Sequence, residues 1–279
     1  MRVFLISLLF LVLCSGCAGP APAQRRAHAD ALADAAGWRR LTLPAAPFVL
    51  AAYVPPAQAP APLLAIYIEG DGHAWATPHT PSNDPTPVQP VALQLALRHA
   101  ASTGSAVAYL ARPCQYRDAA DTTACPARYW TSARYAPEVI AATSLAIDQL
   151  KQRAGARRLL LVGFSGGGAV AALVAARRDD VAQLVTLAAD LDTAEWARLQ
   201  RLQALDGSLN PADFWQRLQG LPQRHFAGAD DLVVPPAVAL AYAARFPPGQ
   251  RPPVTVLPGV DHQCCWLDRW PQLLLNPAD

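Results

Sequence analysis

One stretch of the chain decides the expected fold: Leu160-Leu161-Val162-Gly163-Phe164-Ser165-Gly166-Gly167-Gly168-Ala169-Val170. An apolar run typical of a buried strand leads into Gly-x-Ser-x-Gly, and small residues then begin a helix. A sharp strand-to-helix turn brings neighbouring backbone segments very close, so residues without a side chain are needed beside the serine. Such a turn presents the Ser165 hydroxyl at the end of the sheet. It also aims the backbone N–H of Gly166 at a carbonyl oxygen that becomes negative during attack.

This pattern resembles the nucleophile elbow of α/β-hydrolases, and the resemblance covers about residues 45 to 275. A glycine-rich turn with an incidental serine is the alternative, because Gly-x-Ser-x-Gly also occurs by chance. A phosphate-binding loop is disfavoured, since no Gly-Lys-Ser/Thr follows. A dinucleotide fingerprint should follow the first strand, whereas Gly163 follows about the fourth.

The rest of the chain alternates between strand-like and helix-like runs, as the resemblance requires. Short apolar runs predict strands at 48–54, 63–68, 106–110, 159–162, 184–187, 224–226 and 254–257. Helices are predicted at 91–101, 137–154 and 167–177. Strands that alternate with helices indicate an α/β fold with a mostly parallel sheet covered on both faces. Residues 191–221 read as two short amphipathic helices, either an ordinary crossover or a small cap over the active site.

The triad acid of this family follows a late strand, and one downstream segment resembles that part: Phe226-Ala227-Gly228-Ala229-Asp230-Asp231-Leu232-Val233-Val234-Pro235. The family's spacing, Gly-x-x-Asp followed by Val-Pro two residues later, selects Asp231. Asp230 is the off-by-one alternative, and Asp190 is a third candidate because some members place the acid one strand earlier. Carboxylates also cap helices and turns, which is the structural alternative for all three.

The expected base lies in Val256-Leu257-Pro258-Gly259-Val260-Asp261-His262, after the last strand. A serine hydroxyl is a weak nucleophile and needs a base that an acid holds in one tautomer. A loop histidine past the last strand is where the family keeps that base, so the resemblance implies a triad of Ser165, His262 and Asp231. A capping or surface histidine is the alternative.

The second oxyanion donor should come from Ile66-Tyr67-Ile68-Glu69-Gly70-Asp71-Gly72-His73-Ala74-Trp75. This loop resembles the family's His-Gly segment with Glu69 in place of the histidine. The register selects the backbone N–H of Asp71, with Gly72 as the fallback. We expect the Asp71 carboxylate to point away or to bond elsewhere, because its charge would oppose an oxyanion. Glu69 is a candidate to pair with an arginine such as Arg112, and Arg112 is expected either to form such a loop-fixing ion pair or to bind a substrate carboxylate.

The N-terminus predicts export. An apolar run over residues 3–13 has the size of a signal-peptide core. It leads into Cys14-Ser15-Gly16-Cys17, which resembles the lipobox of bacterial lipoproteins with Cys17 as the lipidated residue, although Cys14 stands where that motif usually has Leu. An ordinary secretory signal is the alternative. Either way we expect the mature protein outside the cytoplasm, in the bacterial cell envelope; with Cys17 lipidated, we expect it to meet the membrane only through that lipid anchor.

The expected organisation is a signal peptide at 1–17, a tether at 18–37 and one hydrolase domain at 38–279. Disulfides persist outside the cytoplasm. Cys114 and Cys125 bracket a polar loop and are expected to form a local disulfide. Cys264 and Cys265 are expected to form a vicinal disulfide or to pair elsewhere.

Composition limits the function classes. Of 279 residues, 52% are hydrophobic and the net charge is only +2, which fits a large core and gives no reason to expect a nucleic-acid partner. The sequence therefore predicts a serine hydrolase that cleaves carboxylic esters of small acyl substrates through an acyl-enzyme, with no metal or organic cofactor. A peptidase or thioesterase of the same fold is the alternative within this class. A non-catalytic envelope lipoprotein that uses the fold as a binding module is the alternative outside it.

Overall fold

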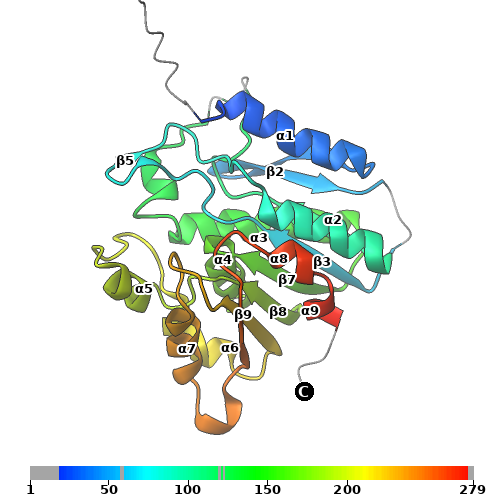
Figure 1. Ribbon diagram of the computed structural model, residues 1–279. Coiled ribbons are helices and arrows are strands. Elements are labelled where there is room, and N and C mark those ends of the chain that lie inside the picture. Colours follow the sequence, from blue (N-terminus) through cyan, green and yellow to red (C-terminus); the bar gives the residue numbers. More distant parts are fainter. Residues whose placement is uncertain (1–18, 57–59, 119–120, 122, 276–279) are drawn as a thin grey trace, which may run out of the picture.

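The computed structural model describes residues 19–56, 60–118, 121 and 123–275. The predicted signal peptide and its candidate lipidation site, Cys17, lie outside these residues. One large sheet crosses the described part of the chain, and helices cover both of its faces (Figure 1). This is the mostly parallel α/β architecture that the sequence predicts.

The large sheet has eight strands in the order β1-β2-β6-β3-β7-β8-β9-β10. β2 pairs antiparallel with both β1 and β6, and every other neighbouring pair is parallel. The strands are β1 (Arg39–Ala45), β2 (Phe48–Val54), β3 (Leu63–Ile68), β6 (Val107–Leu110), β7 (Arg158–Phe164), β8 (Val181–Leu187), β9 (Gln223–Gly228) and β10 (Val254–Leu257). A separate small hairpin consists of β4 (Trp75–Thr77) and β5 (Thr80–Pro81).

The helices divide between the two faces of the sheet. One face carries α1 (Pro22–Ala35), α2 (Val91–Thr103), α8 (Trp266–Arg269) and α9 (Gln272–Leu275). The other carries α3 (Pro137–Arg153), α4 (Gly166–Ala175) and α7 (Pro236–Ala244). Between β8 and β9 lie α5 (Thr193–Gln200), a 3-10 turn (Pro211–Phe214) and α6 (Trp215–Leu218). Further 3-10 turns are Ala127–Trp130 and Pro248–Gln250.

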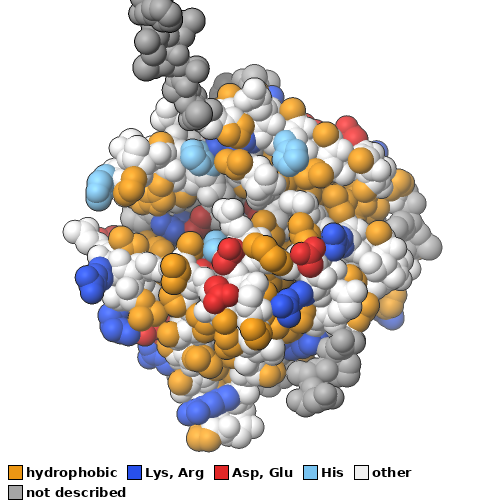
Figure 2. Space-filling view, in the orientation of Figure 1, with side chains coloured by type: hydrophobic (Ala, Val, Ile, Leu, Met, Phe, Trp, Pro, Cys, Tyr) orange, Lys and Arg blue, Asp and Glu red, His pale blue; other side chains and the backbone are white. Residues whose placement is uncertain are grey.

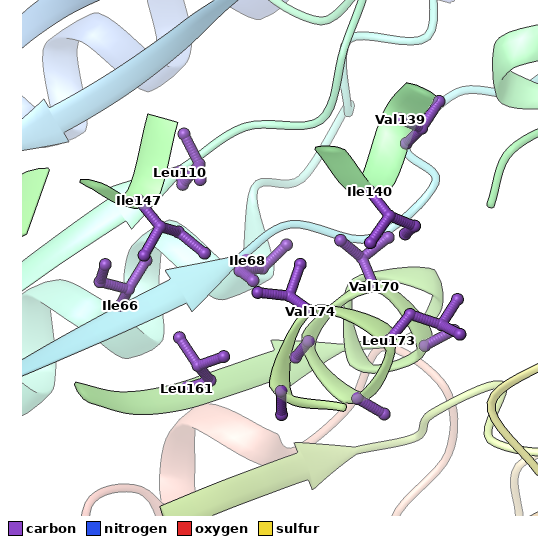
Figure 3. Close-up of a cluster of buried hydrophobic side chains, with 14 of the residues drawn as sticks. Ile66, Ile68, Leu110, Val139, Ile140, Ile147, Leu161, Val170, Leu173 and Val174 are labelled. Atoms are coloured by element: carbon purple, nitrogen blue, oxygen red, sulfur yellow. The ribbon is translucent and has the colours of Figure 1, made fainter. Parts of the chain in front are cut away.

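Apolar side chains on alternate strand positions fill two layers, one on each face of the sheet. Figure 3 shows part of the layer where β3, β6 and β7 meet α3 and α4: Ile66, Ile68, Leu110, Leu161, Val139, Ile140, Ile147, Val170, Leu173 and Val174. Each fully buried aliphatic side chain stabilises the fold by roughly 1.5–3 kcal/mol. This layer therefore fixes α4 firmly against β7, at the turn that holds Ser165.

The parallel strands bring distant segments to one edge of the sheet. The segments that follow their carboxyl ends hold the predicted site residues: Asp71 after β3, Ser165 after β7, Asp190 after β8, Asp231 after β9 and His262 after β10. Ligand and active sites of parallel α/β sheets form at this edge, because the loops there converge.

The expected tether at 18–37 is wrong from Pro22 onward. These residues form α1, which buries Ala29 and Ala33 against the core, and Arg25 donates a hydrogen bond to the carbonyl of Asp84 at 3.2 Å. Small alanines with the right spacing let a helix lie close to the sheet, but they carry a weak hydrophobic signal. In the part of the chain that the structure describes, no helix is long and apolar enough to cross a membrane.

Candidate active site

The turn at Ser165 has the strained geometry that its flanking glycines predict. Ser165 has φ 52° and ψ −129°, in a region that residues with side chains rarely adopt. Its N–H donates to the carbonyl of Leu187 on β8, and its carbonyl accepts from Gly168, both at 2.9 Å. A Cβ on Gly163 would lie 2.4 Å from the carbonyl oxygen of Gly167, so no larger residue fits there. The strain is maintained by these contacts between β7, β8 and α4.

The structure brings Ser165, His262 and Asp231 into one hydrogen-bonded line. His262 Nε2 lies 3.0 Å from Ser165 Oγ, and His262 Nδ1 lies 2.8 Å from Asp231 Oδ2. An ionised carboxylate only accepts hydrogen bonds, so it favours the proton on Nδ1 and leaves Nε2 free to accept from the serine. Asp231 is buried, and its Oδ1 accepts from the backbone N–H of Val233 and Val234, both at 2.8 Å. The carboxylate is thus held from both sides.

The loop that carries His262 is braced by its neighbours. The carboxylate of Asp261 accepts from the backbone N–H of Cys264 at 2.7 Å and so caps the turn. The indole N–H of the fully buried Trp266 points at the carbonyls of Asp261 and His262, at 3.1 and 3.2 Å. A vicinal disulfide joins Cys264 to Cys265. These contacts explain why Asp261, although adjacent to the histidine, is a turn residue and not its partner.

The second disulfide joins Cys114 to Cys125, the local pairing expected from their place around a polar loop. Among the described residues, no three His, Cys, Asp or Glu side chains gather as the ligands of a metal ion would.

The other two candidate acids do not contact His262. Asp190 accepts a hydrogen bond from the Tyr135 hydroxyl at 2.9 Å. Burial, helped by the nearby charge of Asp71, raises the pKa of Asp190 to about 7. Asp230 is exposed, and its backbone N–H donates to the carbonyl of Val260 at 3.0 Å. Of the three carboxylates, Asp231 alone stands at the histidine.

The predicted oxyanion loop lies directly against the turn of Ser165. A Cβ on Gly166 would lie 2.2 Å from Asp71 Oδ1, which measures how closely the two segments approach. Gly166 begins α4, where N–H groups have no intrahelical acceptor. Within the described residues, the N–H of Asp71 also makes no hydrogen bond. Two unpaired backbone donors therefore stand beside Ser165.

The Asp71 carboxylate is bound by two arginines, in keeping with the expectation that it bonds away from an oxyanion. Arg112 Nη1 lies 3.1 Å from its Oδ1, and Arg134 Nη1 lies 2.5 Å from its Oδ2. Burial alone would raise the pKa of Asp71, but the two guanidinium groups outweigh burial and hold that pKa below its ordinary value. The carboxylate is therefore ionised and neutralised where it stands.

One expectation for the neighbouring residues is wrong, and the alternative left open for Arg112 is decided. Glu69 does not pair with Arg112: its carboxyl accepts from the N–H of Gly70 at 2.9 Å and from the Tyr109 hydroxyl at 3.1 Å. Burial raises its pKa to about 7. Arg112 is buried by its contacts with Asp71 and the carbonyl of Arg134, so it fixes the loop and does not face a substrate. The sequence offered several carboxylates near Arg112 and no means of choosing among them.

A cavity of about 1150 Å³ opens beside Ser165 and His262. Its lining is largely apolar, and α5 with the residues after it contributes Trp196, Leu202 and Leu205. The segment 191–221 therefore borders the site. Figure 2 shows a hollow between the β4–β5 hairpin and α5, with both acidic and basic side chains inside it. Arg134 and Asp190 also line the cavity; Asp190 was a candidate acid, whereas nothing in the sequence led us to expect Arg134 there.

No known protein family matches the sequence, and no curated protein does. Solved structures are similar in three dimensions. An α/β serine hydrolase homologue from Coxiella burnetii superposes with a TM-score of 0.55 at 15% identity, over 85% of this chain and 95% of that one. The chain has the α/β-hydrolase fold. Est1E from Butyrivibrio proteoclasticus (TM-score 0.54, 17% identity, 82% and 93% covered) and an esterase of Pyrococcus furiosus (0.56, 13%, 85% and 90%) are similar in the same way.

Proposed function

We propose that this α/β-hydrolase-fold protein is a serine hydrolase that cleaves carboxylic esters. The observation that carries the proposal is the 3.0 Å contact between Ser165 Oγ and His262 Nε2, made at a strained turn that opens into a cavity. A base within hydrogen-bond reach of a hydroxyl, itself oriented by a buried carboxylate, is the arrangement that activates a serine. The esterases among the similar structures are in line with this reading.

In the proposed mechanism, Ser165 attacks the acyl carbonyl while His262 takes the hydroxyl proton. Asp231 holds the imidazole in the tautomer that can accept this proton and stabilises the imidazolium that forms. The N–H groups of Gly166 and Asp71 bind the oxyanion of the tetrahedral intermediate. His262 then protonates the leaving alcohol, and water attacks the acyl-enzyme by the same route in reverse.

Esters are the proposed substrates because an alkoxide leaves a tetrahedral intermediate more readily than an amine does. The largely apolar cavity suits an acyl chain better than a hydrated peptide backbone. Parallel assays with short p-nitrophenyl esters, the matching thioesters and the matching anilides would rank the three classes. Turnover of the anilide above the ester would favour a peptidase instead.

The first test is the replacement Ser165→Ala, with Ser102→Ala on the exposed face of α2 as the matched control. We expect Ser165→Ala to abolish ester turnover and labelling by a fluorophosphonate, with an unchanged melting temperature, while the control keeps both. A Ser165→Ala protein that still hydrolyses esters would overturn the mechanism. A wild-type protein that is neither labelled nor active would favour the non-catalytic binding module.

We also propose that the protein is exported and anchored through a lipid on Cys17. The support is the sequence of residues 1–17 together with two disulfides, which are typical of compartments outside the cytoplasm. Intact-mass analysis of detergent-extracted protein should find a diacylated N-terminal cysteine. Cys17→Ser should release the protein from the membrane fraction, and a protein that fractionates identically with and without this change would refute the anchor.

A further inference from the structure

Arg134 is the feature of the cavity that the proposed mechanism does not use. It lies in the segment between the Ala127–Trp130 turn and α3. Among the described residues that line the cavity, it is the only Arg or Lys, and its side chain is 6% exposed. A guanidinium so far removed from water in a largely apolar cavity is costly unless it has partners.

Part of that guanidinium is already held by the protein. Nε donates to the carbonyl of Thr131 at 2.6 Å, Nη1 to Asp71 Oδ2 at 2.5 Å, and the group lies 5.5 Å from the centre of the Trp196 ring. Nη2 has no hydrogen-bond partner among the described residues, yet it is not one of the fully enclosed polar atoms. Because Arg134 lines the cavity, we take this free edge to be open to the cavity, rigidly aimed and ready to donate.

Asp190 supplies a second unused group on the same cavity wall. Its Oδ2 accepts from the Tyr135 hydroxyl, so the proton of the neutral acid belongs on Oδ1. Oδ1 is buried and has no partner among the described residues. Burial and the charge of Asp71 raise the pKa of Asp190 to about 7, which keeps much of the group protonated near neutrality.

The local charge is out of balance. Arg112 and Arg134 share the single ionised carboxylate of Asp71, and Asp190 adds no full charge while it holds its proton. While Asp190 is protonated, two guanidinium groups therefore face one ionised carboxylate, and Arg134 Nη2 is a donor without an acceptor among the described residues. A carboxylate on the ligand would supply both the missing charge and the missing acceptor.

We infer that Arg134 forms a subsite for a carboxylate of the substrate, so that the enzyme acts on esters that carry an acidic group. This inference rests on the proposed function and narrows its substrate class to monoesters of dicarboxylic acids. Ser165 then attacks the ester carbonyl while Arg134 binds the distal carboxylate. Apolar side chains such as Trp196 and Leu205 cover the methylene chain between the two ends.

The test compares p-nitrophenyl butyrate with the p-nitrophenyl monoesters of succinic, glutaric and adipic acids on the wild-type protein. We expect the best diacid monoester to exceed butyrate in kcat/KM by roughly ten- to hundred-fold, the usual worth of a charge-assisted hydrogen bond. Most of this preference should appear in KM. Arg134→Gln should bring the ratio close to one. The matched control is Arg128→Gln, since Arg128 lies in the preceding turn, bonds to the Tyr129 hydroxyl and does not line the cavity.

A second measurement covers the case in which Arg134→Gln does not fold, as judged by circular dichroism. Calorimetry on the wild-type protein should show binding of succinamate at least ten-fold tighter than binding of succinamide, its neutral analogue. Equal binding of the two compounds, or a diacid preference that survives in folded Arg134→Gln, would overturn the subsite. Butyrate turnover without any diacid preference would overturn the subsite alone. Absence of all turnover and of fluorophosphonate labelling would overturn the proposed function, and the calorimetry would still decide the subsite.

Discussion

Replacing Asp231 by Asn tests the proposed triad most directly, because the structure dictates how the new side chain must sit. Oδ1 of Asp231 accepts two backbone hydrogen bonds, from Val233 and Val234. An asparagine keeps its oxygen there, because the flipped amide would leave both donors unsatisfied at a cost of about 1–3 kcal/mol each. Its NH₂ group then faces His262 Nδ1 and donates to it. The imidazole proton moves to Nε2, which can no longer accept a proton from Ser165.

The expected loss in kcat is therefore that of a wrong tautomer in an otherwise intact site. The corresponding replacement in a serine-protease triad lowers kcat by roughly 10⁴-fold, which is about 5.4 kcal/mol of transition-state stabilisation. The assay is the steady-state hydrolysis of p-nitrophenyl butyrate, with melting temperature as the check on folding. Asp230→Asn is the matched control, since its side chain is exposed one residue away, and it should stay within about two-fold of wild type. If Asp231→Asn retained a tenth or more of wild-type kcat, Asp231 would not be the acid that orients His262.

Three further predictions concern the fold that supports this site. Gly167→Ala should lower the free energy of unfolding by about 3 kcal/mol or more in urea titrations, because its Cβ would lie 2.2 Å from the carbonyl oxygen of Ile68; a loss below 1 kcal/mol would contradict the packing. Burial raises the pKa of Glu69 in the folded protein to about 7, so folding favours its protonated form. The stability that this contributes is fully present below about pH 4.5 and is lost as pH rises through 7. Glu69→Gln should therefore flatten the fall in the free energy of unfolding over this pH range, and an unchanged slope would refute this. Ala33→Asp should destabilise by roughly 3 kcal/mol or more, since Ala33 lies on the buried face of α1, whereas exposed Ala31→Asp should change the melting temperature little; equal melting temperatures would argue for a tether after all.

The sequence predicted the apolar strands of the sheet better than the strand at its β1 edge. The run Leu63–Ile68 matched β3 residue for residue, because a central strand that a parallel sheet buries on both faces reads as a continuous apolar run. Val254–Leu257 matched β10 at the other edge. β1 was missed: it is an edge strand that begins with two arginines and pairs only with β2. α1 was missed because its buried face consists largely of alanine, which a hydrophobic pattern barely distinguishes from a linker.

The same contrast holds within the site. Ser165, His262 and Asp231 were predicted because each stands after a strand in a segment that resembles the corresponding α/β-hydrolase motif, and the structure brings them together. Arg134 was not found, because nothing in its local sequence says that the segment before α3 folds back to the cavity. The backbone N–H of its partner Asp71 was expected at the oxyanion, but for the Asp71 carboxylate the sequence predicted only that it points away or bonds elsewhere. Contacts between loops that follow different strands are set by tertiary packing, and no single stretch of sequence predicts them.

The charges around the Ser165 turn form one connected system, and this has a consequence for the proposed chemistry. A lone Asp71 carboxylate against Gly166 would repel a developing oxyanion. Two guanidinium groups reverse that effect, since their combined charge exceeds the charge of the carboxylate that they bind. This net positive charge persists only while Asp190 holds its proton, because the charge of an ionised Asp190 would cancel it. Arg134 therefore acts in several ways at once. It holds the oxyanion loop through Asp71, it would bind the substrate carboxylate, and its charge contributes to the field at the oxyanion donors.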